Sequence, residues 1–389
     1  MSNIKLRTKQ KGIFRYWHLV VIMMAVFIFL FRIVIKDSSE KIEYGYSRFI
    51  YPFIADTLSL PGKLVPAPYS ASELFAVLMI LLAIAWVLYN IYLCIRKKIS
   101  VIKLFLKTAL NGIAALAGIY FFCMTAWGFN YLRQPFYISL GQESPSVLQQ
   151  TDYEQLAYDA VSLANSLRLK FETSQGKTDS SFRFQLSSFN FINEQTDSAI
   201  EKVVLQISPS RVPSSPPVKY LLSNKFISAC GISGIFLPLF MEPHIDSSLL
   251  LWEQPFVAVH EKAHFMGFAS ETDANLIAYM ACLSSESDIL RYSAALRVLA
   301  SIRHYLPWEK WQDIVEKNLS QGVRKDITDQ YRRIEEYYMR YAALFRAQQK
   351  VNDTYLKLNS QESGVNSYNE ALPHLAVWWK EFSRNDSNF

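Results

Sequence analysis

Three long apolar stretches in the first third of the chain constrain its fold more than any other feature. They cover residues 17–35, 74–95 and 108–129 and are 19, 22 and 22 residues long. The two longer stretches contain no charged residue, and the first is interrupted only by His18 and by Arg32, whose long side chain can reach the membrane interface. About 20 apolar residues cross a bilayer as a helix, so the sequence predicts three membrane-spanning helices and a lipid bilayer as partner.

The first stretch is expected to stay attached as a signal anchor. Cleavable signal peptides have an apolar core of about 7 to 15 residues, followed by a cleavage site of small residues. The stretch here is longer, and no such site is evident after Ile35.

The positions of Lys and Arg predict which loops are cytoplasmic. Residues 1–16 hold five basic and no acidic residues, and so do residues 96–107, between the second and third stretches. Residues 36–73 are nearly neutral, with four basic and five acidic residues. Because positively charged loops stay in the cytoplasm, the chain from about Asn130 onward is expected to be extracytoplasmic.

The charge distribution argues against a nucleic-acid partner. The formal net charge is +6, but residues 1–131 carry 15 basic and 5 acidic residues, whereas residues 132–389 carry 25 and 29. The longer part is therefore mildly acidic and has no basic stripe that would follow a phosphate backbone. We expect a membrane domain over residues 1–131, a separate domain over residues 132–389, and no nucleic-acid partner.

The pattern of residues 132–389 predicts a mainly α domain with a small β part. Helical periodicity dominates its second half, and the strand-like segments all precede Pro255. The predicted elements are helices over residues 153–171 and most of 255–349, breaks near Gly267, Pro307 and Gly322, and short strands at residues 182–186 and 203–207.

The most informative motif is HEKAH, residues 260–264. On a helix, His260 and His264 project from the same face and can bind one Zn²⁺, with Glu261 beside them. In such sites the glutamate is no ligand but takes a proton from a water molecule as that water attacks a carbonyl. The motif therefore predicts a zinc site with Glu261 as the catalytic residue.

A zinc site with two histidines needs a third protein ligand. Gly267 can end the first helix, and Ser270 can cap a second helix whose first turn contains Glu271 and Asp273. These two acids point about 200° apart, so they are not expected to serve the same metal. Glu271 is the preferred ligand, and Asp273, at a capping-box-like position, remains the alternative. Asn275, one turn beyond Glu271, is a candidate for orienting a ligand.

The pair of segments HEKAH and ETDAN resembles the HExxH plus ExxA[DN] arrangement of glutamate-ligand zinc peptidases, in which Glu271 would take the place of the third ligand. The whole chain resembles a bacterial membrane family catalogued as domain of unknown function number 3810. The motifs that carry this resemblance are WGFNYLRQP, GISGIFLP, PFVAVHEKAHFMGFASETDANLIAYMAC, RYSAAL, VNDTYLKLN and GVNSY. The resemblance implies a zincin-like α+β domain, a zinc ion and the inner membrane of a bacterium.

Several weaker features leave alternatives open. Residues 231–239 are either a core strand or a sheet edge that aligns an extended peptide. Cys230 and Cys282 are more simply two small buried residues than a disulfide. Three histidines without ligand-like spacing are expected to be ordinary surface or core residues, and three tyrosines are candidate oxyanion donors. These are His244, His304 and His374, and Tyr292, Tyr355 and Tyr368.

The sequence thus predicts a multi-pass membrane protein with a zinc-dependent metallopeptidase domain that hydrolyses a peptide or protein outside the cytoplasm. His260, His264 and Glu271 are the predicted Zn²⁺ ligands, and Glu261 is the predicted general base. The alternative is a non-catalytic sensor or binding module in which zinc is structural.

Overall fold

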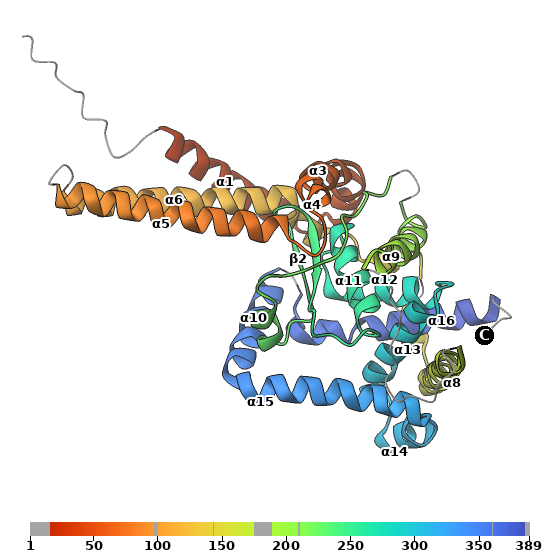
Figure 1. Cartoon of the computed structure of the whole chain (residues 1–389). Coiled ribbons are helices and arrows are strands. Elements are labelled where there is room, and N and C mark those ends of the chain that lie inside the picture. Colours follow the sequence, from red (N-terminus) through yellow and green to blue (C-terminus); the bar gives the residue numbers. More distant parts are fainter. Residues whose placement is uncertain are drawn as a thin grey trace, which may run out of the picture. The chain divides into compact units, whose positions relative to one another are not determined.

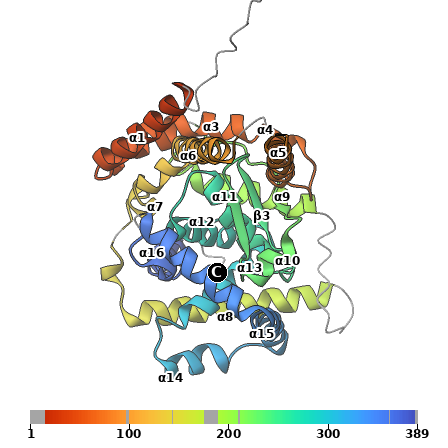
Figure 2. The same cartoon turned by 90° about the vertical axis from the view of Figure 1, so that its left-hand side faces the viewer.

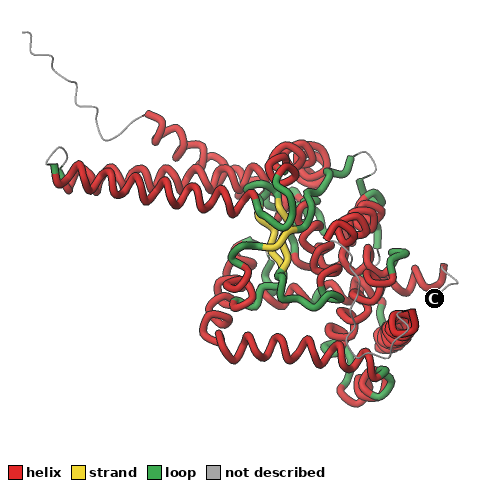
Figure 3. Tube along the Cα trace, viewed as in Figure 1, coloured by secondary structure: helices red, strands yellow, loops and turns green. Residues whose placement is uncertain are grey.

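The computed structural model describes residues 16–96, 100–142, 144–174, 189–208, 211–359 and 361–385. The chain forms two compact units. The first unit consists of residues 1–38 and 74–129, and the second consists of residues 39–73 and 130–389. Helices dominate both, and three short strands lie together in the second (Figure 1, Figure 3). The predicted mainly α fold class is confirmed.

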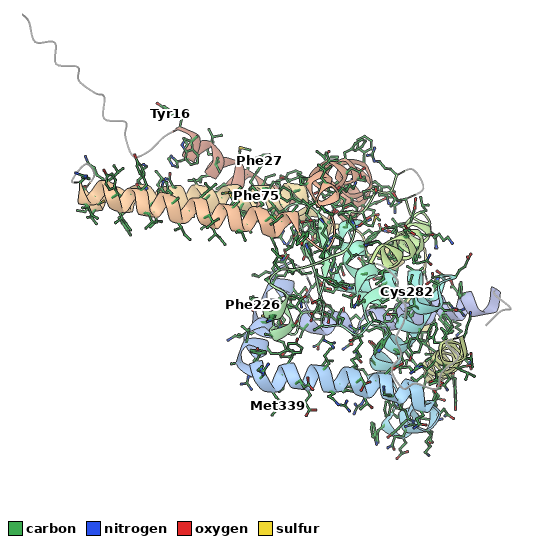
Figure 4. All side chains as sticks on the ribbon, viewed as in Figure 1. Tyr16, Phe27, Phe75, Phe226, Cys282 and Met339 are labelled. Atoms are coloured by element: carbon green, nitrogen blue, oxygen red, sulfur yellow. The ribbon has the colours of Figure 1, made fainter. Side chains whose placement is uncertain are left out.

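The first unit is built from the three long apolar helices. These are α1 (Tyr16–Ile35), α5 (Ala71–Ile95), whose first turn belongs to the second unit, and α6 (Val101–Ala126). Each is long and apolar enough to cross a membrane, which indicates a multi-pass membrane protein. Their apolar side chains, such as Phe27 and Phe75, project outward, as on helices that face lipid (Figure 4).

The third long helix differs from its prediction at both ends. α6 begins at Val101, seven residues before the predicted start, and ends at Ala126 rather than at residue 129. Ser100 caps it by accepting a hydrogen bond from the backbone N–H of Lys103. The first two turns therefore contain Lys103 and Lys107, which the sequence suggested as loop residues; Lys97 and Lys98 lie outside the described residues. Charged first turns fit a helix that extends beyond the bilayer core.

The second unit surrounds a small sheet. Strand β1 (Lys219–Tyr220) pairs in parallel with β3 (Glu242–Ile245), and β2 (Gly234–Leu237) pairs with β3 in antiparallel. The order is β1-β3-β2, so β2 is at an edge among the described strands. β3 is buried along its whole length.

The helices of this unit, in chain order, are α2 (Ser39–Lys41), η1 (Ile42–Ile50), α3 (Tyr51–Leu58), α4 (Leu60–Leu64), η2 (Gly128–Leu132, begun in the first unit), α7 (Phe136–Ser139), η3 (Pro145–Val147), α8 (Gln150–Ser174), α9 (Phe189–Val204), α10 (Asn224–Ala229), α11 (Gln254–Phe265), α12 (Glu271–Leu283), α13 (Asp288–Ile302), α14 (Trp308–Trp311), η4 (Gln312–Glu316), α15 (Gln321–Leu358), η5 (Gly364–Tyr368) and α16 (Ala371–Asn385).

Two helices form the centre of the second unit. α11 packs on the sheet and against α12, and α12 also contacts α9, α13 and α16 (Figure 2). α12 is buried on every side from Asp273 to Leu283, which is the pattern of a central helix rather than an amphipathic one. Cys282 on this helix and Cys230 are buried and free, as the simpler interpretation predicted (Figure 4).

One predicted feature of this unit was wrong. Residues 203–207 are not a strand but the end of α9 and the turn after it. Val203 and Val204 are buried there, and a short apolar run suits a buried helix face as well as a strand. The predicted break near Gly322 is confirmed: η4 ends at Glu316 and α15 begins at Gln321, so Gly322 lies in the first turn after the break. The strand predicted at residues 182–186 lies outside the described residues.

Candidate metal centre

The two histidines of the HEKAH motif lie on the last turns of α11. Helical spacing brings their rings onto one face, with centroids 4.7 Å apart. Glu271, the first residue of α12, completes the group. Its Oε2 lies 3.2 Å from Nε2 of His260 and 3.7 Å from Nε2 of His264. One ligand atom from each of the three residues falls within 4.8 Å of the others, which defines a candidate His-His-Glu metal-binding group.

A tight turn between α11 and α12 brings Glu271 to the histidines. Gly267 adopts a φ of +86°, and the next backbone N–H, of Phe268, donates 3.1 Å back to the carbonyl of Ala263. A Cβ on Gly267 would come within 2.8 Å of the Tyr51 ring, so close approach as well as backbone conformation requires glycine. Ser270 then caps α12 by accepting from the N–H of Asp273.

The donor atoms of the group fit a metal ion. Nδ1 of His264 lies 2.8 Å from the carbonyl oxygen of Phe268, and donation to it leaves Nε2 available as a ligand. Bonds of about 2.0 to 2.1 Å in a tetrahedral zinc site would place ligand atoms about 3.4 Å apart, between the two distances measured here. Among the described residues, Oε2 of Glu271 is buried and has no hydrogen-bond partner besides the two imidazoles that are themselves candidate ligands. Buried polar atoms are rarely left so unless something else binds them.

Electrostatics in the group favour a cation. Burial alone would lower the pKa of His264, but the Glu271 carboxylate beside it raises it to about 9. Burial would raise the pKa of Glu271, yet the two imidazoles hold it well below its usual range. Burial lowers the pKa of His260, which keeps that imidazole neutral and able to bind a metal. A cation on these side chains would displace the proton of His264.

Glu261 lies beside the group without being part of it. Its side chain is buried, and no hydrogen bond or ion pair holds its carboxylate in the described part of the chain. Burial raises its pKa to about 8, a shift that Glu271 increases and His264 opposes. Strand β2 passes close by: a Cβ on Gly234 would meet Val257 at 2.7 Å and Cγ of Glu261 at 2.8 Å. Glycine at this position therefore leaves room for the Glu261 side chain.

Asp273, the alternative third ligand, does not join the histidines. Its Oδ1 accepts a hydrogen bond of 2.9 Å from the backbone N–H of Phe136. Burial raises its pKa to about 6, although that hydrogen bond and Arg133 oppose the shift. Asp273 therefore joins the start of α12 to the segment that follows the third long helix.

Of the three tyrosines considered from the sequence, Tyr368 lies next to the group. Burial and then the charge of Glu271 raise its pKa. Tyr355 pairs with Tyr131, hydroxyl to hydroxyl, at 3.0 Å. Tyr292 lies elsewhere, where its hydroxyl donates to Asp326. Asn275 donates to the carbonyl of Tyr368, so this hydrogen bond supports that segment rather than a ligand.

The C-terminal motifs VNDTYLKLN and GVNSY build one wall of the site. Gln361, between them, accepts a hydrogen bond of 3.1 Å from the N–H of Glu271, and Thr272 donates to the carbonyl of Ser367. Asp353 on α15 accepts from the N–H of Val365 and so joins the two motifs. Sequence reasoning missed Gln361, because nothing in its spacing relates it to residues 90 positions earlier.

Residues of the loop between the first two long helices, together with Arg133, hold the turn between α11 and α12. The Tyr51 hydroxyl donates to the carbonyl of Phe265, and Arg133 donates to the carbonyl of Gly267, both at 2.8 Å. Arg133 is held by a buried ion pair with Glu43, also at 2.8 Å. Ser47 donates to Asn130 nearby. The turn that positions Glu271 is thus clamped by residues from outside the HExxH region.

The remaining histidines take no part in the group. His244 is buried in β3, His304 is exposed, and His374 stacks on Tyr137. Within the described ranges, only His260, His264 and Glu271 come together as a set of candidate metal ligands.

The fold and the site define a mainly α protein that has three helices long and apolar enough to cross a membrane and a candidate His-His-Glu metal site, in an arrangement like that of HExxH proteins. The chain belongs to the family described as protein of unknown function (DUF3810), which matches residues 46–376. This confirms the family resemblance inferred from the motifs. Searches among curated proteins and among solved structures gave no match.

Proposed function

We propose that this protein is a membrane-anchored, zinc-dependent metallopeptidase that hydrolyses a peptide or protein bond outside the cytoplasm. His260, His264 and Glu271 hold the Zn²⁺, and Glu261 is the general base. The observation that carries the proposal is the convergence of three ligand atoms within 4.8 Å beside a buried glutamate for which the described residues provide no hydrogen bond or ion pair. A glutamate with a purely structural role would be expected to be hydrogen-bonded.

The chemistry assigned to this chain centres on Glu261. Zinc in such a site polarises the scissile carbonyl and makes water easier to deprotonate. Glu261 takes the proton from the attacking water and then gives it to the leaving amine. Burial raises the pKa of Glu261 to about 8 in the metal-free chain, and a bound cation beside it would lower that pKa and favour the carboxylate that accepts the proton. The hydroxyl of Tyr368, which lies near Glu271, is the candidate donor to the oxyanion.

Strand β2 is the proposed binding edge for the substrate backbone. It lies at an edge of the described sheet, and its residue Gly234 adjoins Glu261. An extended peptide that pairs with a sheet edge gains main-chain hydrogen bonds and runs parallel to that edge. Pairing at β2 would carry the scissile bond past Glu261.

The orientation in the membrane rests on the positively charged loops. With residues 1–16 and 96–107 in the cytoplasm, residues 132–389 lie outside, in the multi-pass arrangement of a bacterial inner-membrane protein. A reporter that is active only outside the cytoplasm, fused after residue 389, is expected to be active. Activity of a reporter that works only in the cytoplasm would reverse the orientation.

The test of the function is turnover by the Glu261→Gln variant. Purified full-length protein is incubated with a peptide library and with cell-wall peptide fragments, and products are identified by mass spectrometry. The proposal predicts products with the wild type, at least about 100-fold less turnover with Glu261→Gln, and unchanged zinc content in both. Glu335→Gln, on an exposed position of α15, is the matched control. If zinc is purely structural, neither protein yields products and His260→Ala unfolds the domain.

A further inference from the structure

Helices η1, α3 and α4 bury many polar side chains and expose many apolar ones. Their buried stripe follows a spacing of about four residues and is rich in polar groups, whereas their exposed stripe is mostly apolar. In a water-soluble helix the apolar stripe faces the core. We call these three helices, residues 42–64, the platform helices. Their buried stripe is Glu43, Ser47, Tyr51, Ala55, Ser59 and Gly62, and their exposed stripe is Tyr44, Phe49, Phe53, Thr57, Leu60 and Leu64.

The buried stripe is fixed by specific contacts within the second unit. Glu43 pairs with Arg133, and Tyr51 donates to the carbonyl that ends α11. At the other end, Nζ of the buried Lys219 donates to the carbonyl of Gly62 at 2.6 Å. These contacts fix the rotation of the platform helices, so the exposed stripe cannot turn inward.

The side chains of the exposed stripe carry no charge, and all of them except Thr57 are aromatic or aliphatic. Phe49 is 68% exposed, Phe53 51% and Leu64 81%, and the rings of Phe49 and Phe53 contact each other edge to face. Two cations border the stripe: Arg48 lies over the ring of Tyr44, and Arg211, paired with Asp56, lies 4.0 Å over the ring of Phe53. An apolar strip with aromatic residues and flanking cations is typical of helices that lie in a membrane interface.

Chain continuity favours lipid as the occupant of this surface. The platform helices begin seven residues after α1 ends at Ile35 and end seven residues before α5 begins at Ala71. Both neighbours are candidate membrane-spanning helices, so both ends of the platform segment lie at the same face of the bilayer. Figures 1 and 2 show α3 and α4 at one end of the second unit and α14 and α15 at the opposite end.

We propose that the exposed stripe of the platform helices lies in the interfacial region of the bilayer and seats the second unit on the lipid surface. The opposite face of the same helices clamps the turn between α11 and α12. The candidate metal centre therefore lies about one helix layer, roughly 10 Å, from the lipid. If the proposed peptidase function also holds, its substrates are segments close to a membrane surface.

Spin labels on the full-length protein test this contact with the bilayer without reference to activity. Phe49→Cys, Phe53→Cys and Leu64→Cys are labelled one at a time with a nitroxide, in protein whose Cys94 and Cys123 are replaced by serine. The protein is reconstituted in nanodiscs of phosphatidylcholine and phosphatidylglycerol. Collision rates with oxygen, which concentrates in lipid, and with a water-soluble nickel chelate are compared by electron paramagnetic resonance. Met339→Cys, whose native side chain is 74% exposed on α15, is the control (Figure 4).

The proposal predicts that oxygen collisions exceed nickel collisions at all three platform positions and that the order is reversed at residue 339. Nickel accessibility at the platform positions equal to that of the control would overturn it. Low accessibility to both reagents would overturn it too, because it would mean that protein, such as a second copy of the chain, covers the stripe. Three independent positions keep the test decisive if one variant fails to fold.

Discussion

Two buried polar clusters in the second unit contrast in how their hydrogen bonds are satisfied. In the first, the Glu242 carboxylate is fully buried and accepts from Nζ of Lys219 at 2.7 Å. It also accepts from the hydroxyl of Ser70 and from the backbone N–H groups of Ala71 and Ser72. In the second, the candidate metal centre, Oε2 of Glu271 faces two imidazoles that are themselves candidate ligands, and it has no other partner in the described chain.

The difference separates a stabilising cluster from a binding one. The donors around Glu242 join β3 to the start of α5, so this network ties the sheet to the loop between the first two long helices. In the metal centre, hydrogen bonds also hold the backbone around the ligands, but the candidate ligand atoms themselves remain available to bind a cation. A buried carboxylate whose oxygens are bonded to protein donors stabilises the fold, whereas one that faces only candidate ligand atoms can accept a cation.

The largest expected effect is loss of stability when the satisfied cluster is broken. Lys219→Met removes the only cation bonded to Glu242 in the described structure and leaves that carboxylate buried. Removing one partner of a buried ion pair costs about 3–5 kcal/mol, so the midpoint of denaturant unfolding in detergent should fall markedly. Lys317→Met, at an exposed pair with Asp313, should change little. Equal midpoints for the two variants would contradict this assignment.

Glu271→Gln should act on metal affinity rather than on the fold. Loss of a supporting hydrogen bond costs about 10- to 100-fold in metal affinity, and loss of a direct ligand should cost more than about 100-fold. Asp273→Asn is the matched control, since its amide oxygen can still accept from the N–H of Phe136. Zinc titration with a competing chelator measures both. Loss of zinc in Asp273→Asn, with retention in Glu271→Gln, would reverse the ligand assignment.

A methyl group at Gly234 should slow turnover without removing the metal. The added Cβ would contact the side chains of Val257 and Glu261, and so displace the general base. A shift of about 1 Å in a catalytic group can cost up to about 100-fold, so we expect a 10- to 100-fold fall in turnover of any substrate identified. Gly45→Ala, where an added Cβ meets nothing within 4 Å, should behave as the wild type. Loss of zinc from Gly234→Ala would indicate a wider disturbance.

The smallest expected effect is the acid sensitivity of the clamp around Glu43. Burial alone would raise the pKa of Glu43, but Arg133 and Arg48 hold it below its usual value of 4.5. The folded-state pKa is thus the lower one, so this stabilisation is complete above about pH 4.5 and is lost as the pH falls through the folded-state pKa. Metal-free protein should melt at lower temperature below pH 4.5, and Glu43→Gln should flatten that dependence. An unchanged slope in the variant would show that other groups cause it.

Local sequence rules predicted the core of the site. The i, i+4 spacing of two histidines, a glycine that ends a helix and a serine that caps the next one depend only on neighbouring residues. The helical geometry favoured Glu271 over Asp273 as the third ligand, and in the structure Glu271 is the acid that lies with the two histidines. Length and composition likewise predicted the three long helices.

Contacts between distant segments could not be predicted in this way. Gln361 lies 90 residues from Glu271, and Arg133 lies 134 residues from Gly267. Neither periodicity nor local spacing relates such pairs, because their proximity results from tertiary packing. The same limit explains the wrong strand at residues 203–207, whose apolar residues are buried by a helix rather than by a sheet.

The most direct test of the central claim is the metal content of the purified full-length protein. Inductively coupled plasma mass spectrometry should find about one zinc ion per chain in wild type, as expected for a site with three protein ligands. Zinc should be lost in His260→Ala and kept in His304→Ala, whose native side chain is exposed and outside the group. Folded wild-type protein that binds no metal, even when zinc is supplied, would contradict the account.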